Sequence, residues 1–460
     1  MSILIQNGTL LCPDGPVRAD LRVEGDKIAE IGPSLPVGES TVLDAAGKLV
    51  FPGFIDTHTH FEMNKGTIRE TADNWTTGTR AALAGGTTCV LDFAEPARGC
   101  SLQSALDEWH ARADGHASCH YGFHMTIKDW DSRIQAEIPA MTAQGVTSYK
   151  VYLAYANIRV SDAVAYEAIK AVAREGGVVG CHCENGDLID QAIAELKAAG
   201  KLSPASHPLS HPAVMEAEAV TRWLALAEQA GWQVIVVHLS SRRGLEAARA
   251  ARARGQKVYL ESCPQYFTLT EEKYALPGFE GAKYVCAPPL RPQSDVDALW
   301  EALEGGEIDT IGTDHCSFRF QPTKMLGKDD FSAIPGGIPG TEHRPALMYT
   351  CGVSTGRITA HQMMQALAEH PAKLFGMFPQ KGALAVGSDA DITIFDPNLS
   401  WTISAAGQYQ NVDYTPYEGM AMAGRTDTVL LSGQVAVADG KVLAEGLGRY
   451  VHRGPAQFWR

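Results

Sequence analysis

Four histidines and one aspartate stand at or just after the ends of short apolar runs: His58, His60, His182, His238 and Asp314. Within Asp-Thr-His-Thr-His, two imidazoles two residues apart lie on one side of an extended backbone. Imidazole and carboxylate together suit zinc, with manganese or cobalt as substitutes, whereas calcium and magnesium require mostly oxygen ligands. Any one histidine alone could be an ordinary buried residue that is hydrogen-bonded to the backbone. All five together predict a metal site, provided that the fold brings them to one place.

Lys150 stands inside a further apolar run, from Ser148 to Leu153. An ammonium group with a reference pKa of about 10.4 would be costly to bury beside metal cations. Carboxylation of the amine by carbon dioxide would give an anionic group whose two oxygens can bridge two metals. We therefore predict a carboxylated Lys150, and the alternative is a surface lysine whose stem lies along apolar side chains.

Short apolar runs alternate along the chain with segments long enough for helices, which is the pattern of parallel βα units. Eight such units predict an α/β fold with a closed (β/α)8 barrel of the TIM type, in which the carboxyl ends of the strands converge on one mouth. The four histidines and Asp314 would then meet there, and Lys150 lies on the fourth strand. The expected strands are Phe54 to His58, Thr88 to Phe93, His120 to Met125, Ser148 to Leu153, Val178 to His182, Val234 to His238, Val258 to Ser262 and Thr310 to Asp314.

Both ends of the chain carry shorter strand-like runs separated by turn residues. We expect residues 1–52 and 376–460 to share one smaller β domain, with a tail at the end, beside a barrel at residues 53–375. Residues 212–230 and 242–254 are rich in Ala, Leu, Glu and Arg and predict helices.

The composition excludes several classes of protein. A net charge of −14 without clustered Lys and Arg argues against nucleic-acid binding. No uncharged run approaches the roughly 18 apolar residues that cross a bilayer. The first residues lack the features of a secretory signal, so we expect a cytoplasmic protein. Ten scattered cysteines predict buried thiols and no disulfides in a reducing compartment.

The chain resembles the metal-dependent amidohydrolases, and within them the dihydropyrimidinase and D-hydantoinase branch, over nearly its whole length. The resemblance implies the (β/α)8 barrel together with a β-sandwich composed of both chain ends. It also implies a homotetramer, because relatives are commonly tetramers. The segments that carry it are Pro52 to His60, Ser148 to Lys150 with Tyr155, His182 to Asn185, His238 to Ser240, Glu261 to Tyr266, Thr313 to Cys316, Gly382 to Asp391 and Tyr414 to Gly419.

When the family's ligand positions are carried over to this sequence, the resemblance implies a set of metal ligands. It implies that His58, His60 and Asp314 hold one divalent metal, that His182 and His238 hold a second, and that carboxylated Lys150 bridges them. All six positions are filled by the expected residue types. We expect the two metals to be zinc.

The expected reaction is hydrolysis of a ring amide in dihydropyrimidines or 5-substituted hydantoins. A water shared by two divalent metals becomes a hydroxide near neutral pH and can attack the carbonyl carbon. Asp314 would accept the remaining proton and pass it to the departing ring nitrogen. A tyrosine phenol would stabilise the developing oxyanion. Strand geometry allows either Tyr152 or Tyr155, and only the resemblance selects Tyr155.

The resemblance places backbone groups around the cyclic amide in the segments that contain Ala287 and Gly336. Relatives usually carry Ser and Asn at these positions, so backbone contacts can persist while the pocket changes shape. Met63, Lys65 and Tyr152 fall where relatives place residues around the exocyclic substituent, although ordinary packing or exposed residues are an equally good interpretation.

Two other functions remain open from the sequence. One is a dihydroorotase- or allantoinase-like cyclic amidohydrolase, and the other is a binding protein without catalysis on the same scaffold. Dihydroorotases typically have an Arg two residues after the second histidine of the pair, which pairs with the substrate carboxylate. This chain has Glu62 there, which argues against an anionic substrate.

Overall fold

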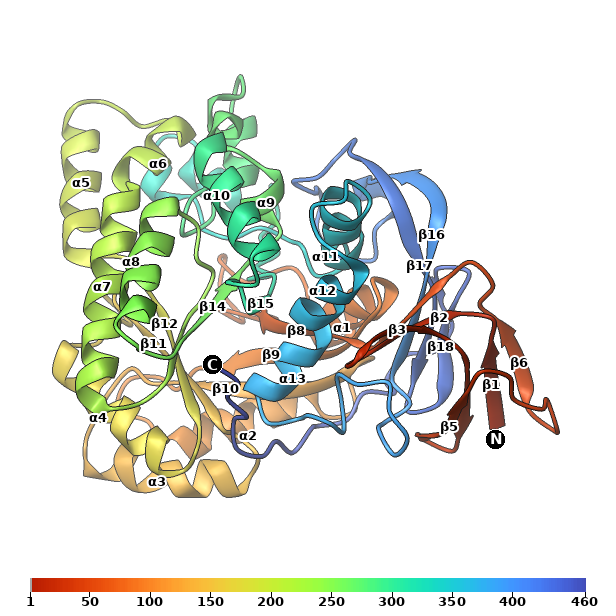
Figure 1. Ribbon diagram of the computed structural model, residues 1–460. Helices are drawn as coiled ribbons and strands as arrows, with labels where there is room; N and C mark the ends of the chain where they lie inside the picture. Colours follow the sequence, from red (N-terminus) through yellow and green to blue (C-terminus); the bar gives the residue numbers. More distant parts are fainter. Residues whose placement is uncertain (1) are drawn as a thin grey trace.

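The computed structural model of the protein describes residues 2–460 and contains a barrel of eight parallel strands (Figure 1). All eight expected strands are present, in the spatial order of the sequence. Every residue of these strands is buried. This explains why their sequences are apolar runs and do not alternate between apolar and polar residues. The strands are β8 (Phe54–Thr59), β9 (Thr87–Ala94), β10 (His120–Thr126), β11 (Ser148–Tyr152), β12 (Val178–His182), β13 (Val234–Val236), β14 (Val258–Ser262) and β15 (Thr310–Ile311).

Helices surround the barrel, and most of the long ones begin at a side chain that caps their first turn. Asn74, Ser101, Asp131, Ser161, Asn185 and Ser241 each accept a hydrogen bond from a backbone N–H of the helix that follows. The helices are α1 (Trp75–Ala84), α2 (Leu102–Ala113), α3 (Ser132–Ala143), α4 (Asp162–Arg174), α5 (Gly186–Ala198), α6 (His207–Ser210), α7 (Ala213–Ala230), α8 (Arg242–Ala253), α9 (Gln265–Thr268), α10 (Gln293–Glu304), α11 (Arg344–Met348), α12 (Ala360–Met364) and α13 (His370–Leu374). α7 and α8 are the two helices expected from the sequence.

Shorter turns complete the helical structure. Tyr349–Val353 and Gln365–Glu369 continue α11 and α12 as π-helical turns. Single 3-10 turns lie at Pro204–Ser206, Glu271–Ala275, Glu280–Tyr284, Lys324–Gly327, Phe331–Ala333 and Ala405–Gly407.

Side chains close the barrel between its first strand, β8, and its last, β15. Arg344, which is fully buried at the start of α11, donates through Nη1 to the carbonyl oxygens of Ile55 (2.7 Å) and Ile311 (2.8 Å). Asp56 accepts hydrogen bonds from the backbone N–H of Thr313 (3.1 Å) and from its hydroxyl (2.7 Å). These contacts join β8 to the end of β15, where the ladder itself is only two residues long.

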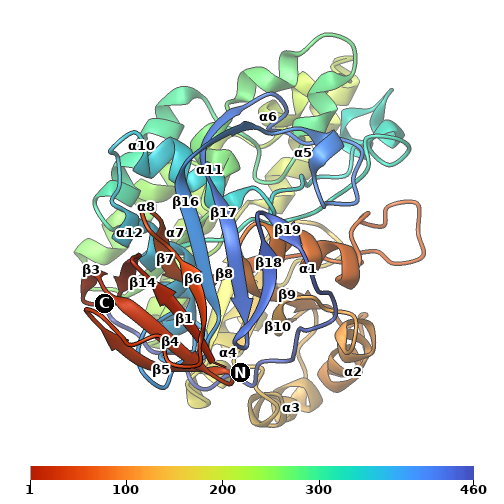
Figure 2. The same ribbon diagram turned by 90° about the vertical axis from the view of Figure 1, so that its right-hand side faces the viewer.

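Both chain ends contribute to two further sheets, as expected from the sequence. A four-stranded sheet has the order β5-β4-β1-β6, and a seven-stranded sheet has the order β19-β18-β17-β16-β7-β2-β3. Figure 2 shows the N-terminal strands beside the long C-terminal strands β16 and β17. These strands are β1 (Ser2–Gln6), β2 (Thr9–Cys12), β3 (Gly15–Arg18), β4 (Asp20–Glu24), β5 (Lys27–Gly32), β6 (Thr41–Asp44), β7 (Leu49–Pro52), β16 (Ile392–Thr402), β17 (Ala421–Leu431), β18 (Gln434–Ala438) and β19 (Lys441–Val442).

Residues of both sheets share one apolar core cluster, which is the packing of a β-sandwich. β7 pairs antiparallel with β16, so the two chain ends meet within one sheet. We retain the domain boundaries at 52/53 and 375/376 as a proposal.

The C-terminal tail packs against the amino-terminal end of the barrel. Tyr450 forms a parallel bridge with Tyr121 of β10, and the buried Arg453 donates to the hydroxyl of Ser148 on β11 (2.7 Å). Arg460 pairs with the buried Asp309 at 2.7 Å. The tail therefore covers the end of the barrel opposite the expected site.

The remaining expectations concern the cysteines and the membrane. All ten cysteines are free thiols in the structure. Eight of them lie buried or half-buried within residues 53–375, and Cys100 is the one exposed cysteine in this range. No helix within residues 2–460 is long and apolar enough to cross a bilayer.

Replacing Arg344 with Met should destabilise the fold. The change keeps an apolar stem but leaves two buried carbonyl groups without their donor, which costs roughly 1–3 kcal/mol each. We expect the apparent unfolding temperature, measured at one heating rate, to fall by roughly 5 °C or more. The exposed Arg243 on α8 provides the control, because Arg243→Met removes the same group from the surface. Equal unfolding temperatures for the two variants would show that Arg344 does not hold the barrel closed.

Candidate metal centre

The six predicted ligands gather at the carboxyl end of the barrel. His58 lies on β8, Lys150 on β11 and His182 at the end of β12. His60 follows β8 directly, whereas His238 and Asp314 lie two and three residues beyond the last residues of β13 and β15. The expected strands that end at His238 and Asp314 were therefore too long by two and three residues. All six side chains nevertheless converge.

One half of the cluster is formed by His58, His60 and Asp314, whose ligand atoms lie within 4.8 Å of one another. The Oδ1 atom of Asp314 is 3.3 Å from Nε2 of His58 and 3.2 Å from Nε2 of His60. Nζ of Lys150 lies 2.9 Å from the same His58 nitrogen.

The other half is formed by His182 and His238. Nδ1 of His182 lies 3.0 Å from Nε2 of His238. The rings of His238 and His58 have centroids 5.3 Å apart, so the two halves adjoin. Nζ of Lys150, on β11, contacts His58, and its charge also acts on His238.

The chemistry of these donors fits divalent metal ions. Burial, reinforced by the nearby Lys150 ammonium, holds the pKa of His58 and His238 well below its usual range, so their ring nitrogens keep free lone pairs. Burial acts to raise the pKa of Asp314, but His58 and the hydrogen bond from His60 outweigh it and keep the group a carboxylate. Two pairs of nitrogens lie about 3 Å apart, Lys150 with His58 and His182 with His238, an arrangement that a bound cation would stabilise.

Buried carboxyl groups orient His58 and His182 by a hydrogen bond to one ring nitrogen of each. Nδ1 of His58 donates to Glu261 (2.6 Å), which also accepts from the hydroxyl of Thr57 (2.6 Å). Nε2 of His182 donates to Glu184 (2.9 Å). Each contact fixes the tautomer that leaves the other ring nitrogen free for a metal.

The surroundings shift the pKa values of these two carboxyl groups in opposite directions. Burial raises the pKa of Glu261 to about 7. Burial acts in the same direction on Glu184, but His211 and the hydrogen bond from His182 lower the pKa of that carboxyl to about 2.

Asp92, at the end of β9, is a positioning residue that sequence reasoning missed. It accepts hydrogen bonds from the backbone N–H of Phe61 (2.8 Å) and from the hydroxyl of Thr59 (3.0 Å), on either side of His60. A buried Asp at the carboxyl end of a barrel strand was the available signal, but its partners lie more than 30 residues away in the chain.

Backbone strain accumulates at the site. His238, Asp314 and Tyr155 have φ angles of 40°, 53° and 65°, in the left-handed region that residues other than glycine seldom occupy. Such conformations cost about 1–3 kcal/mol each and persist where the surrounding structure enforces them, typically at functional positions.

The two candidate tyrosines stand on the same side of the cluster as His182. The ring centroid of Tyr155 is 5.0 Å from that of His182, and that of Tyr152 is 5.8 Å away. Tyr155 is 38% exposed, whereas Tyr152 is only 5% exposed and packs over Lys150. Tyr155 is therefore the more exposed of the two.

Comparison with known proteins agrees with this architecture. The profile of the Amidohydrolase family matches residues 49–436. The chain belongs to the amidohydrolase family. The D-hydantoinase of Ralstonia pickettii is 41% identical to it over 98% of this chain and 99% of its own, and the D-hydantoinase of Geobacillus stearothermophilus is 41% identical over 98% and 97%.

Solved structures of family members have the same fold. The crystal structure of dihydropyrimidinase from Brevibacillus agri NCHU1002 superposes with a TM-score of 0.97 at 40% identity and covers 100% of both chains. L-Hydantoinase (dihydropyrimidinase) from Arthrobacter aurescens superposes with a TM-score of 0.90 at 31% identity over 98% of this chain and 99% of its own. The fold expected from the sequence is thereby confirmed.

Ala287 and Gly336, the two positions expected near the substrate ring, lie close to each other. A Cβ atom built on Gly336 would lie 3.8 Å from the Cβ of Ala287, an ordinary contact. Gly336 is thus not required by crowding or by a left-handed backbone, whereas its neighbour Gly337 (φ 152°) is. Two small residues so close together leave more room than larger side chains would at these positions.

Lys324 joins the two segments that carry these residues. Its side chain is fully buried, and Nζ donates to the carbonyl oxygens of Val285 (2.8 Å) and Pro335 (3.1 Å). Burial lowers the pKa of Lys324 to about 7. A lysine buried to tie two loops together has no signature in the local sequence, and this role was missed.

Glu62 is not the free negative charge that the sequence suggested, because it forms an ion pair. It is buried, and its Oε2 lies 2.5 Å from Nζ of Lys65, which is exposed. The ion pair reduces the repulsion that Glu62 alone would exert on an anionic ligand. An acidic residue still stands where a carboxylate-binding Arg would be needed.

Replacing Lys324 with Met should loosen both loops. Without the two hydrogen bonds, backbone amides at 285–291 and 334–337 should exchange with solvent at least about tenfold faster, since each buried carbonyl that loses its donor costs roughly 1–3 kcal/mol. Hydrogen exchange followed by mass spectrometry measures this directly. The exposed Lys328 provides the matched control, Lys328→Met. Unchanged exchange in Lys324→Met would show that other contacts fix the loops.

Proposed function

We propose that this protein hydrolyses the ring amide of dihydropyrimidines and 5-substituted hydantoins with two divalent metal ions, expected to be zinc. The convergence of six potential ligands at the barrel mouth carries this proposal. His58, His60 and Asp314 would hold one ion and His182 and His238 the second, with Lys150 between them. Support for the substrate class comes from relatives named D-hydantoinase and dihydropyrimidinase that match over nearly the full chain.

A carboxylated Lys150 is part of the proposal. The side chain is 2% exposed, and burial lowers its pKa. Among residues 2–460 no carboxylate lies within 4 Å of Nζ, which instead faces an imidazole nitrogen. Carboxylation would replace a poorly compensated cation with an anion suited to bridge two metals.

The proposed reaction assigns a task to each residue at the mouth. Two bound divalent ions would supply the nucleophile by lowering the pKa of a water to near neutrality. The second carboxylate oxygen of Asp314 would accept a proton and deliver it to the departing ring nitrogen. The phenol of Tyr155 would donate to the carbonyl oxygen as negative charge develops there. Backbone groups near Ala287 and Gly336 would hold the ring, with the extra room accommodating the substituent.

The alternative substrates are less well matched to the mouth. Dihydroorotate brings a carboxylate, and the position that would supply its Arg holds the Glu62–Lys65 ion pair. A neutral cyclic diamide needs no such partner. As for assembly, we infer a homotetramer from the resemblance to tetrameric relatives, which light scattering on the purified protein can test.

Lys150→Ala should remove the bridge between the two metal sites. We expect metal content to fall from about two ions per chain to one or none, and turnover to fall by more than the ~10²-fold lost when an outer partner of a metal ligand is removed. Lys150→Arg should not restore either, because a guanidinium stays cationic. Elemental analysis measures the metal, and a ¹³C label from bicarbonate should be retained by the wild type and by the control Lys170→Ala only. Full metal content in Lys150→Ala would contradict the bridging role.

The substrate class can be decided with a panel of cyclic amides at fixed metal content. We expect kcat/KM for dihydrouracil, hydantoin or phenylhydantoin to exceed that for dihydroorotate by at least ~10²-fold, because burying an unpaired carboxylate costs several kcal/mol and each 1.4 kcal/mol is tenfold. Preference for dihydroorotate or allantoin would overturn the assignment. A protein with full metal content and no turnover of any of these compounds would instead be a binding protein.

A further inference from the structure

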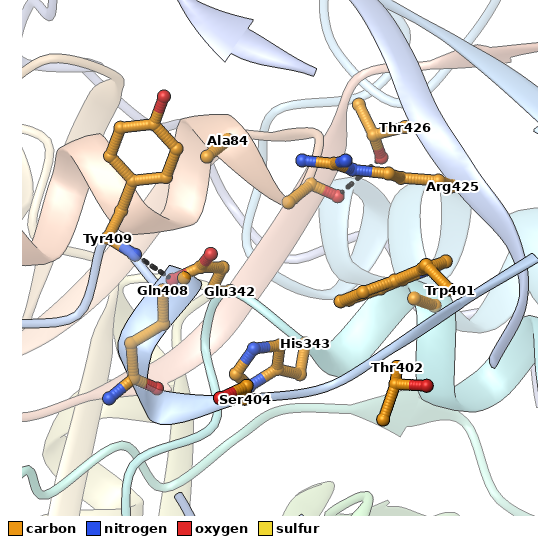
Figure 3. Close-up of a pocket in the computed structure, with 13 residues that line it drawn as sticks. Ala84, Glu342, His343, Trp401, Thr402, Ser404, Gln408, Tyr409, Arg425 and Thr426 are labelled. Carbon is orange, nitrogen blue, oxygen red and sulfur yellow. Dashed lines mark hydrogen bonds between the residues drawn. The ribbon is translucent and has the colours of Figure 1, made fainter. Parts of the chain in front are cut away.

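A separate cavity of about 270 Å³ lies where the start of α11 meets the sheet formed by β16 and β17 (Figure 3). Its walls come from the end of α1, from residues 342–346, from β16 and β17, and from the segment 404–409 that joins them. None of the six proposed metal ligands lines it. This space is large enough for a small organic molecule and not only for single waters.

Glu342 presents a carboxyl group to this cavity. One of its oxygens, Oε2, accepts hydrogen bonds from the backbone N–H groups of Tyr409 (2.7 Å) and Gln410 (3.1 Å). Burial raises the pKa of Glu342 to about 8. The carboxyl group is therefore mostly protonated at pH 7 and can donate a hydrogen bond to a ligand.

His343 is a buried imidazole with unused hydrogen-bonding capacity. It is 2% exposed, and its Nδ1 has no hydrogen-bond partner among residues 2–460. Burial, together with the nearby His315, lowers the pKa of His343 to about 3, so the ring is neutral. An unpaired buried ring nitrogen costs free energy that a ligand in the cavity could recover.

Arg425 brings a positive charge to the mouth of the cavity. Its guanidinium lies over the ring of Trp401, 5.5 Å from the ring centroid, and Figure 3 shows both side chains facing the space that Glu342 borders. The indole N–H of Trp401 is already used, because it donates to the carbonyl of Gly424 (3.0 Å). No carboxylate among residues 2–460 lies within 4 Å of the Arg425 guanidinium, although the protein carries a net charge of −14.

We propose that this cavity is a second ligand site, which binds a small organic carboxylate with an aromatic or apolar body. The carboxylate would pair with Arg425 and accept a hydrogen bond from Glu342 or His343, while the body packs against Trp401 and Tyr409. A cationic ligand would be repelled by the positive charge of Arg425. A ligand without a charge would gain nothing from the charge of Arg425, whose exposed guanidinium donates only to the carbonyl of Gly440 (3.4 Å).

Binding should depend on pH in a defined direction. A protonated Glu342 accommodates a carboxylate, and an ionised one repels it, so affinity is nearly full at pH 7, falls by about half near pH 8 and declines further above it. Between pH 7 and pH 9 the affinity should fall about tenfold. The other ionisable side chains around Glu342 are Asp73, His343, Tyr409 and Arg425. Burial opposes ionisation of Asp73, but the hydrogen bond from His315 keeps its pKa below the usual value, and the imidazole of His343 is neutral throughout this range.

The test is calorimetric titration of the purified, metal-loaded protein with benzoate at pH 7. Arg425→Gln should weaken binding at least about tenfold, the loss expected for one charge-assisted hydrogen bond. Arg357 provides the matched control, since its guanidinium lies over another indole, Trp300, at 5.3 Å, and Arg357→Gln should bind as the wild type does. Glu342→Gln keeps an acceptor for the two backbone N–H groups and should bind benzoate equally at pH 7 and pH 9.

Each outcome decides the proposal. Benzoate can also approach metal ions, but that binding would be unaffected by Arg425→Gln and would be lost when the metals are removed. Two results overturn the proposal. One is benzoate binding that is unaffected by Arg425→Gln and lost with the metals, and the other is no binding of benzoate at all. Binding that weakens in Arg425→Gln, and loses its pH dependence in Glu342→Gln, supports it whether or not the protein turns over cyclic amides.

Discussion

The closure of the barrel between its first and last strands is the constraint on which the metal centre depends. β15 contains only two residues, so backbone pairing alone holds little of this seam. Asp56 accepts hydrogen bonds from both Thr313 and the hydroxyl of Thr341 (2.9 Å), and Arg344 spans the carbonyl groups of β8 and β15. These links fix the pair His58 and His60 relative to Asp314. Because metal-ligand distances tolerate changes of only about 0.2 Å, this fixation is a condition for the site.

Burial determines the charges at the mouth. It keeps His58 and His238 neutral, and so leaves their ring nitrogens able to bind a cation. Under the proposed function, two metal ions bring four positive charges into a space that water scarcely enters. Asp314, a carboxylated Lys150 and the outer carboxyl groups of Glu184 and Glu261 would offset that charge. The same features that make an ammonium at Lys150 unfavourable therefore favour its conversion to an anion.

The sequence predicted the framework because buried parallel strands and their polar ends are local features. Eight apolar runs placed the barrel, and the residues that end them placed the candidate ligands. The failures involve contacts between distant parts of the chain or backbone shape. The positive φ angles of His238 and Asp314 arise because the surrounding fold bends the chain just beyond short strands. The links made by Asp92, Lys324 and Arg344 cross tens to hundreds of residues and leave no periodic pattern.

Reactivity and selectivity rest on different parts of this structure. The candidate ligands are carried by barrel strands or by residues just beyond them, whose positions are fixed by the seam and by buried carboxylates. Ala287 and Gly336 lie on loops that Lys324 joins through the backbone carbonyls of Val285 and Pro335 rather than through side chains. A loop held by its backbone can change side chains without moving its main chain. Two small residues that face each other can therefore widen the pocket while the N–H and C=O groups that would hold a cyclic amide stay in place.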